Sequence, residues 1–446
     1  MMSPETLAQD ERQRRRSFGV GLGVLVVLAF VLRVVVAGSL GPLRGGDAQW
    51  YSNLAIDLSQ GSGFVDPIKY RFWGETGISL FKPPLWSGVL TIPSALFPDN
   101  PVTAQRIVAC LLGAVMVLLV GLTARRLAGR AAGLFAAALA AVAPNLVMLD
   151  GLLLVESIYA TTIAAILFVS FRLDRRRDLV SAALLGALIG LGMLQRVDAA
   201  LIVPLLAVPL FVRIRNCDGF ALRAGVAVAS MFLILAPWSV YASVKTHSVV
   251  VVSSNAGEAI TNANCDETWN GRIAGYWSLT CLGKQPDDRG AAYAVRHLES
   301  SPRVALQRVG RSFDFYRPFQ NQSLATLIDG RPPAMARLGL FVWYAMLPLA
   351  VVGYVALKRS KKWTWPLVAM VGLSIVVSVA IHGETRFRVP AVVAVTILAG
   401  VALGRLVPSG DAGSLSEDDR TNASGTEVAG VTSSGVVEPD SEADSV

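Results

Sequence analysis

The chain contains about ten apolar runs, most of them near 20 residues long, the length at which a helix crosses the hydrocarbon core of a bilayer. Hydrophobic residues make up 53% of the 446 residues and charged residues only 16%, which is typical of a polytopic membrane protein. We therefore predict an all-α protein with about ten transmembrane helices. The expected spans are residues 18–40, 103–123, 131–149, 152–172, 179–195, 198–213, 223–244, 337–357, 363–382 and 387–407.

Basic residues are concentrated in the short connections on one side of these spans. Because cytoplasmic loops carry an excess of Lys and Arg, this side is predicted to be cytoplasmic, in what would be a plasma membrane, and both termini lie there. Attraction to anionic lipid explains the net charge of +8 without a nucleic-acid partner. The basic segments are 12–16, 125–130, 172–178, 213–215 and 358–362.

The chain is predicted to have three parts. Residues 1–17 form a cytoplasmic N-terminus, and the first span is too long and lacks the cleavage site of a signal peptide, so it is expected to remain as an anchor. Residues 18–407 form the transmembrane domain. Residues 408–446 are rich in Ser, Gly and acids, and are predicted to be a disordered, acidic cytoplasmic tail.

Two larger segments, 41–102 and 245–336, fall on the outer side of the membrane in this topology. Within the first, residues 84–98 are apolar but contain prolines, and we expect an interfacial or re-entrant helix. Cys265 and Cys281 lie in the second, where disulfides persist, so a bond between them is predicted, with two free thiols as the alternative. Cys110 and Cys217 are expected to be free.

Ionisable residues far apart in the sequence are brought to the outer face by the same topology. A charge in or beside hydrocarbon is costly, so a convergent set of acids and bases there indicates an active site. The candidates are Asp47, Lys82, Asp150, Glu156, Arg196, Asp198, His382, Arg386 and Arg388.

Each candidate also has a structural interpretation. Asp47 and Asp150 are in positions where an aspartate caps a helix, and Lys82 in one where a lysine meets lipid phosphates. Glu156, expected about one and a half turns inside a span, indicates either function or a buried ion pair. Arg196 also fits a local ion pair with Asp198.

The last outer turn, IHGETRFRVP at 381–390, runs against the positive-inside trend. Arg386 and Arg388 are guanidinium groups, which bind phosphate bidentately, so a phosphate ligand accounts for them; His382 lies beside them. The alternative is that they pair with Glu384 and with lipid phosphates.

The first outer loop combines GD-x-x-x-Y-x-x-x-A-x-x-L-x-x-G-x-G from residue 46 with K-P-P-L from residue 82. This pattern resembles the GT-C glycosyltransferases, in particular the family 39 and aminoarabinose-transferase-like branch. The Cys-bracketed segment 253–281 resembles that of family 39-type proteins from high-GC Gram-positive bacteria. The resemblance covers roughly residues 15–405, and it names neither the sugar nor the acceptor.

The resemblance implies a membrane enzyme that takes a sugar from a polyprenyl-phosphate donor on the outer face and transfers it to a glycan, lipid or protein hydroxyl. It implies a catalytic acid at Asp47, a second acidic position at Glu156, and phosphate contacts from Lys82 and the R-x-R-x-P turn. Ala48 stands where many members carry a second acid. A divalent metal therefore has no paired acidic motif in this loop to support it, and metal dependence stays open.

A transporter or lipid flippase is the alternative, because it too places charges within spans. Such a protein is expected to show internal repeats and broken helices near the membrane midplane. No clear repeat is present, and the charged residues gather at one face. A catalytically inactive family member fits the same sequence.

Overall fold

The computed structural model describes residues 4–407, so the predicted tail lies outside the described residues. The described residues form helices and contain no β-strand, which confirms the predicted all-α class. Six of the helices are long and apolar enough to cross a membrane, and three further apolar helices are shorter. The helices that follow the predicted spans are α1 (Pro4–Ser39), α5 (Pro101–Val142), α6 (Pro144–Leu152), α7 (Glu156–Arg176), α8 (Leu179–Met193), α9 (Val208–Arg213), α10 (Phe220–Thr246), α16 (Pro333–Arg359), α17 (Trp365–Ala380) and α18 (Val389–Gly404).

The long element α5 is a helical hairpin that covers the predicted span 103–123 and most of the span 131–149, which continues into α6. Its backbone leaves the helical region at Ala128 and Gly129, and Gly129 has a φ of 87°, which favours glycine. A Cβ on Gly121 would lie 3.1 Å from the Cβ of Ala137, so the two halves run side by side. The chain therefore reverses at this turn, as the separate spans 103–123 and 131–149 predict.

The predicted span 198–213 is irregular. It consists of a 3-10 helix, η1 (Val197–Leu201), a π-helix, η2 (Val203–Ala207), and the short α9. Pro204 and Pro209 explain this, because proline lacks the N–H that continues an α-helical ladder. The number of membrane crossings is therefore not fixed by helix length alone.

The centre of the bundle is α18, which is almost entirely buried against α5, α7, α16 and α17. Small residues allow these helices to approach closely, as is usual where membrane helices pack. A Cβ on Gly353 of α16 would lie 2.0 Å from the Leu398 carbonyl oxygen of α18. In contrast, the long helix α10 packs on α8, and few of its residues are buried.

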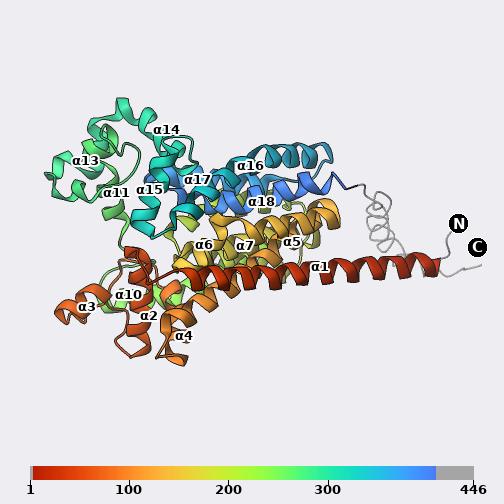
Figure 1. Ribbon diagram of the computed structural model, residues 1–446, viewed down its shortest axis with the longest axis horizontal. Coiled ribbons are helices and arrows are strands. Elements are labelled where there is room, and N and C mark those ends of the chain that lie inside the picture. The colour runs from red at the N-terminus through yellow and green to blue at the C-terminus, as the bar shows by residue number, and fades with distance from the viewer. Residues whose placement is uncertain (1–3, 408–446) are drawn as a thin grey trace, which may run out of the picture. The chain divides into compact units, whose positions relative to one another are not determined.

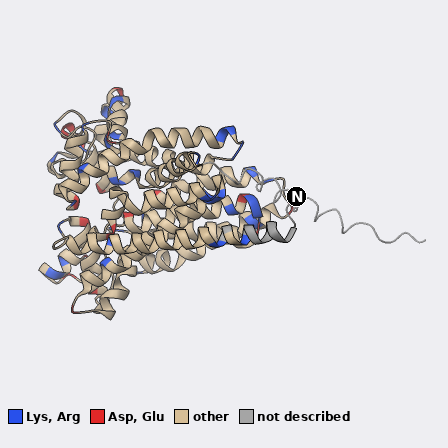
Figure 2. Ribbon diagram, turned by 45° about the vertical axis from the view of Figure 1, so that its right-hand side comes forward, with Lys and Arg blue, Asp and Glu red and all other residues tan. Residues whose placement is uncertain are grey.

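The two predicted outer segments lie together at one end of the bundle, whereas α1 begins and α18 ends at the other (Figure 1). Clusters of Lys and Arg lie at the end away from these segments, whereas the segments carry both basic and acidic residues (Figure 2). The segments touch, because the Ser254 backbone N–H donates to the Leu80 carbonyl at 2.8 Å. Their helices are α2 (Gly46–Ser59), α3 (Pro67–Trp73), α4 (Leu85–Leu96), α11 (Ala256–Ala263), α12 (Asp266–Trp269), α13 (Gly290–Arg296), α14 (Ser301–Ser312) and α15 (Pro318–Asp329), with short 3-10 turns η3 (Leu279–Gly283), η4 (Pro286–Asp288) and η5 (Leu298–Ser300).

Candidate active site

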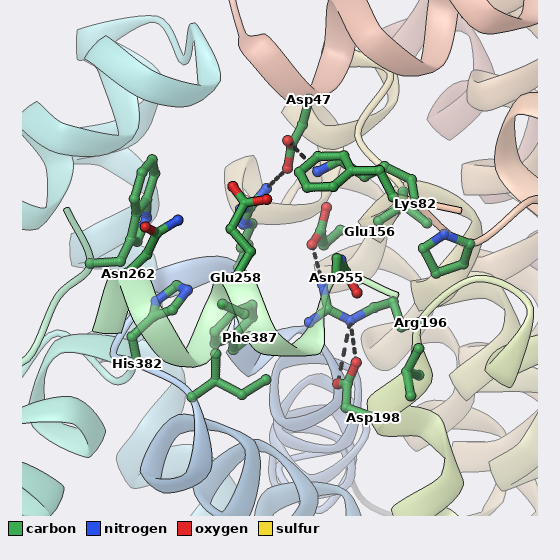
Figure 3. A pocket seen from close by; sticks show the side chains of 18 of the residues that line it. Asp47, Lys82, Glu156, Arg196, Asp198, Asn255, Glu258, Asn262, His382 and Phe387 are labelled. Atoms are coloured by element: carbon green, nitrogen blue, oxygen red, sulfur yellow. Dashed lines mark hydrogen bonds and ion pairs between the residues drawn. The ribbon is translucent and has the colours of Figure 1, made fainter. Parts of the chain in front are cut away.

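A cavity of about 470 Å³ opens at the outer-segment end of the bundle. It brings together side chains from both outer segments and from three connections between spans (Figure 3). Its polar and charged lining residues are Asp47, Tyr51, Lys82, Glu156, Gln195, Arg196, Asp198, Asn255, Glu258, Asn262, Trp277, His382 and Arg386.

Asp47 lies between two cations at this cavity. Lys82 Nζ donates to one carboxylate oxygen at 2.5 Å, and Arg386 Nη1 donates to the other at 2.5 Å. Burial raises the pKa of Asp47, but these two positive charges and their hydrogen bonds outweigh it and hold the pKa well below its usual range. The N-cap of α2 is Gly45, and no side chain caps it, so Asp47 does not cap this helix.

Lys82 is held in place by its aromatic neighbours. Its ammonium nitrogen lies 5.7 Å from the ring centroid of Tyr51 and 5.2 Å from that of Phe81, within cation–π range. Two prolines follow it and lead into α4. The charge of Lys82 therefore points into the protein toward Asp47 and not out along a lipid surface.

Arg386 connects Asp47 to a second carboxylate. It lies in the 3-10 turn η6 (Thr385–Arg388), and its Nε donates to Glu384 Oε2 at 2.8 Å. Burial raises the pKa of Glu384 to about 7, because its desolvation and the nearby Asp329 charge exceed the opposing effect of Arg386. The predicted alternative for Arg386, pairing with Glu384, is thus present together with the contact to Asp47.

Arg196 joins two further acids. Its Nη1 donates to Glu156 Oε1 at 2.6 Å, and its Nε donates to Asp198 Oδ1 at 3.0 Å. Burial lowers the pKa of Arg196, but both carboxylates raise it more, and the net shift is upward. The local pair with Asp198 exists, yet the same guanidinium also holds Glu156 at the cavity wall (Figure 3).

The structure corrects the expected position of Glu156. It is the first residue of α7 and not one and a half turns inside a span, because the chain turns at Leu153, which has a φ of 55°. At a helix N-terminus the partial positive charge of the backbone favours a carboxylate. Glu156 is 1% exposed, and its Oε2 has no hydrogen-bond partner among the described residues.

Two predicted site residues do not line the cavity. Asp150 lies inside α6, where Arg33 Nε donates to it at 2.9 Å and the Ser157 hydroxyl also donates to it. Arg388 Nη1 donates to Asp314 Oδ2 at 2.5 Å. Both therefore form buried ion pairs inside the protein, and the helix-cap interpretation does not apply to Asp150, which is near the end of its helix.

His382 lines the cavity as a neutral imidazole. Burial and the neighbouring charges of Arg386, Arg308 and Arg196 lower its pKa well below the usual value. It lies 6.3 Å from the Trp277 ring, measured between ring centroids. His382 therefore offers hydrogen bonding to a ligand and no positive charge.

The predicted disulfide Cys265–Cys281 is present, and Cys110 and Cys217 are free. Two residues of the loop that it closes, Trp277 and Leu279, line the cavity. The Ser278 backbone N–H donates to the Asn262 carbonyl at 2.9 Å, and Gly383 N–H donates to the Gly275 carbonyl at 2.8 Å. These bonds tie the Cys-bracketed loop to the turn that carries His382.

Several cavity residues were not among the sequence candidates. Asn255, Glu258, Asn262 and Trp277 come from the second outer segment, and Gln195 precedes Arg196. The available signals were the richness of residues 253–281 in Asn and Trp and the helical spacing of Asn255, Glu258 and Asn262, but neither says which side chains face inward. Within residues 4–407 no group of three His, Cys, Asp or Glu side chains is arranged to hold a metal.

Comparisons with known proteins agree with this architecture. A sequence model of the dolichyl-phosphate-mannose-protein mannosyltransferase family matches residues 81–241. ArnT from Cupriavidus metallidurans bound to undecaprenyl phosphate superposes with a TM-score of 0.54 at 18% identity over 91% of this chain. The archaeal oligosaccharyltransferase AglB from Archaeoglobus fulgidus, in complex with an inhibitory peptide and a dolichol-phosphate, superposes with a TM-score of 0.53 at 15% identity over 94%. A search of curated proteins finds no significant match.

The chain therefore has the GT-C glycosyltransferase fold and is a multi-pass membrane protein. It covers 63% of the ArnT chain and 53% of the AglB chain, so it spans less than two thirds of these structures. The fold confirms the GT-C class that the resemblance in the first outer loop predicts.

Proposed function

We propose that the protein is a membrane glycosyltransferase that moves a sugar from a polyprenyl-phosphate donor to an acceptor hydroxyl. The observation that carries this proposal is the meeting of Lys82, Asp47 and Arg386, from three distant segments, at one cavity. Two cations can hold a phosphate, and the carboxylate between them can take a proton. ArnT bound to undecaprenyl phosphate and AglB with a dolichol-phosphate share the fold and support the donor class.

The reaction needs no nucleotide, because the phosphodiester already activates the sugar. The acceptor oxygen attacks the anomeric carbon, and the bond from that carbon to the phosphate oxygen breaks. The acceptor proton passes to Asp47, and the electron pair leaves with polyprenyl phosphate, whose added negative charge is stabilised by Lys82 and Arg386. A single displacement inverts the anomeric centre.

We place the cavity on the outer face of the plasma membrane, with both termini in the cytoplasm. The support is the positive-inside rule applied to the basic end of the bundle, opposite the outer segments (Figure 2). An outward cavity receives a lipid-linked donor from the membrane and a glycan, lipid or protein acceptor from the wall or surface. Envelope glycan assembly or protein glycosylation is the proposed setting.

Asp47→Asn tests the chemical step. Asparagine keeps the shape but is no base, so transfer from a radiolabelled polyprenyl-phosphate sugar is expected to fall by about 10²–10⁴-fold. Carrier binding is expected to persist or tighten, because Lys82 and Arg386 lose the anion they now hold. Near-normal transfer would contradict the assignment and leave Glu156, which also lines the cavity, as the base.

Arg386 substitutions test the carrier site. Arg386→Ala should weaken the binding of polyprenyl phosphate more than Arg386→Lys, because lysine keeps the charge but loses the planar fork. A matched control is Arg303→Ala, an exposed arginine in α14 that hydrogen-bonds Asn270 outside the cavity. If Arg386→Ala binds carrier as tightly as this control, Arg386 does not hold the phosphate.

A further inference from the structure

We propose that the wall of the cavity formed by Glu156, Gln195, Asn262, Trp277 and His382 binds the transferred sugar and accepts a neutral, hydroxyl-rich sugar in preference to one bearing a carboxylate. This inference rests on the proposed function, since it concerns the donor of the same site. It assigns a substrate class and five positioning contacts that the ion-pair network around Asp47 does not use.

Each of these five side chains has a buried polar atom without a hydrogen-bond partner among the described residues. The atoms are Glu156 Oε2, Gln195 Oε1, Asn262 Oδ1, Trp277 Nε1 and His382 Nδ1. All five residues line the one cavity. Buried polar groups are normally paired, and leaving them unpaired costs free energy, so their concentration here indicates a polar ligand.

The partnered atoms of the same residues fix which atoms remain for a ligand. Gln195 Nε2 donates to Thr162 Oγ1 at 2.9 Å, which leaves the amide oxygen. Glu156 Oε1 accepts from Arg196, which leaves Oε2. Asn262 and His382 stand on the side of the cavity away from Lys82 and Arg196 (Figure 3). A ligand in the cavity therefore lies between Asn262 and His382 on one side and Glu156 on the other (Figure 3).

The chemistry of the unpartnered atoms selects hydroxyl groups. Three are acceptors, the indole nitrogen of Trp277 is a donor only, and the neutral imidazole of His382 donates or accepts according to its tautomer. A hydroxyl both donates and accepts, so several hydroxyls on one ring can satisfy the whole set. An ammonium group only donates, so Trp277 still needs a hydroxyl of the same sugar as its acceptor.

The charges of the cavity disfavour a carboxylate on the sugar. Of its three cations, Lys82 and Arg386 are assigned to the donor phosphate, and Arg196 is held by Glu156 and Asp198. Glu258 lines the same cavity and has no ion-pair partner within 4.0 Å among the described residues. A uronate carboxylate would thus meet Glu156 and Glu258 with no uncommitted cation to neutralise it, and like charges brought together are costly.

The test compares four ligands on the purified full-length protein in lipid nanodiscs: polyprenyl phosphate alone, and polyprenyl phosphates carrying a hexose, the matching hexuronate or the matching amino-hexose. Binding is measured by displacement of a fluorescent polyprenyl phosphate. The hexose conjugate is expected to bind more tightly than the bare carrier, and the hexuronate about tenfold or more weaker than the hexose.

Two variants connect the preference to the wall. Trp277→Phe keeps a ring but removes the N–H, and Asn262→Ala removes the amide; each should weaken the hexose conjugate by about threefold to tenfold and leave the bare carrier unchanged. Asn270→Ala, an exposed asparagine of the same Cys-bracketed loop, is the matched control and should change neither. Retained melting temperature shows that the variants fold.

The outcomes separate this inference from the proposed function. Equal binding of hexose and hexuronate, or variants that weaken bare carrier and conjugate alike, would overturn the sugar wall while the carrier site stands. Weaker binding of the amino-hexose than of the hexuronate would overturn the charge argument, because Glu156 and Glu258 attract a cation and repel an anion. If the bare carrier and every conjugate fail to bind, the proposed function fails with it.

Discussion

Both carboxylate oxygens of Asp47 are engaged, one by Lys82 and the other by Arg386. A carboxylate so strongly stabilised is a weak base, which at first sight argues against a catalytic role. An anionic phosphate, however, competes for the same two cations. We therefore expect donor binding to loosen the ion pairs and to restore the basicity of Asp47, so that the base is active only when the leaving group is in place.

Glu384 makes carrier binding depend on pH. Its folded-state pKa of about 7 exceeds the usual 4.5, so the carboxyl holds a proton below pH 7 and loses it as the pH rises. The ionised form competes with phosphate for Arg386. Affinity for a polyprenyl-phosphate sugar, whose phosphodiester stays singly charged, should therefore fall several-fold between pH 6 and pH 8.

Glu384→Gln removes the titrating group and keeps the shape. This variant should bind the donor at pH 8 about as well as the unaltered protein does at pH 6, with a nearly flat pH profile between them. Displacement titrations at several pH values provide the measurement. A profile that keeps its slope in Glu384→Gln would assign the titration to another group, Asp47 and Asp329 being the acids nearest to Arg386.

The sequence predicted the residues that meet at the cavity, but it also assigned to the site two residues, Asp150 and Arg388, that do not line the cavity. Asp47, Lys82 and Arg386 could be grouped because an alternating topology alone brings them to one face. Asp150 and Arg388 satisfy the same rule, yet each is held inside by a partner far away in the sequence, Arg33 at a separation of 117 residues and Asp314 at 74. Topology gives the level of a residue in the membrane and not the direction of its side chain.

At the scale of elements, the predicted spans mostly correspond to helices, because long apolar runs have few other ways to satisfy their backbone in a membrane. The differences lie where local backbone chemistry decides. Prolines divide 198–213 into short 3-10, π and α segments, and Leu153 turns the chain so that α7 begins at Glu156. In the outer segment 253–281, the cavity residues Asn255, Glu258 and Asn262 follow a helical spacing along α11, but the spacing alone does not say which face of so short a helix turns to the cavity.

Close helix contacts predict a specific intolerance in the bundle. Gly353→Ala places a Cβ 2.0 Å from the Leu398 carbonyl oxygen, so α16 and α18 must separate. Overpacking of this kind costs about 1–3 kcal/mol. The melting temperature of Gly353→Ala in detergent should fall. Gly23→Ala in α1 is the matched control, because no atom lies within 4 Å of its added Cβ and alanine favours the helix; equal melting temperatures would contradict the packing argument.

At the scale of the whole molecule, the separation of the cavity from the basic connections bears on both fold and function. The outer segments and the connections between spans meet at one end of the bundle, and the basic connections gather at the other (Figure 2). In the proposed topology, the distribution of charge that orients the chain in the membrane also places the cavity away from the cytoplasm. The three cations that line the cavity, Lys82, Arg196 and Arg386, are each paired with acids.

Sidedness follows as a prediction about intact cells. Lys69 is exposed in α3, in the first outer segment, and residue 420 belongs to the acidic tail. In a Cys217→Ser background, Lys69→Cys should react with a membrane-impermeant maleimide added outside, whereas Arg420→Cys should react only after the membrane is permeabilised. Labelling of both from the same side would contradict the proposed topology. Labelling of Arg420→Cys alone from outside would invert it and would place the cavity in the cytoplasm, where a donor would have to be presented on the inner leaflet.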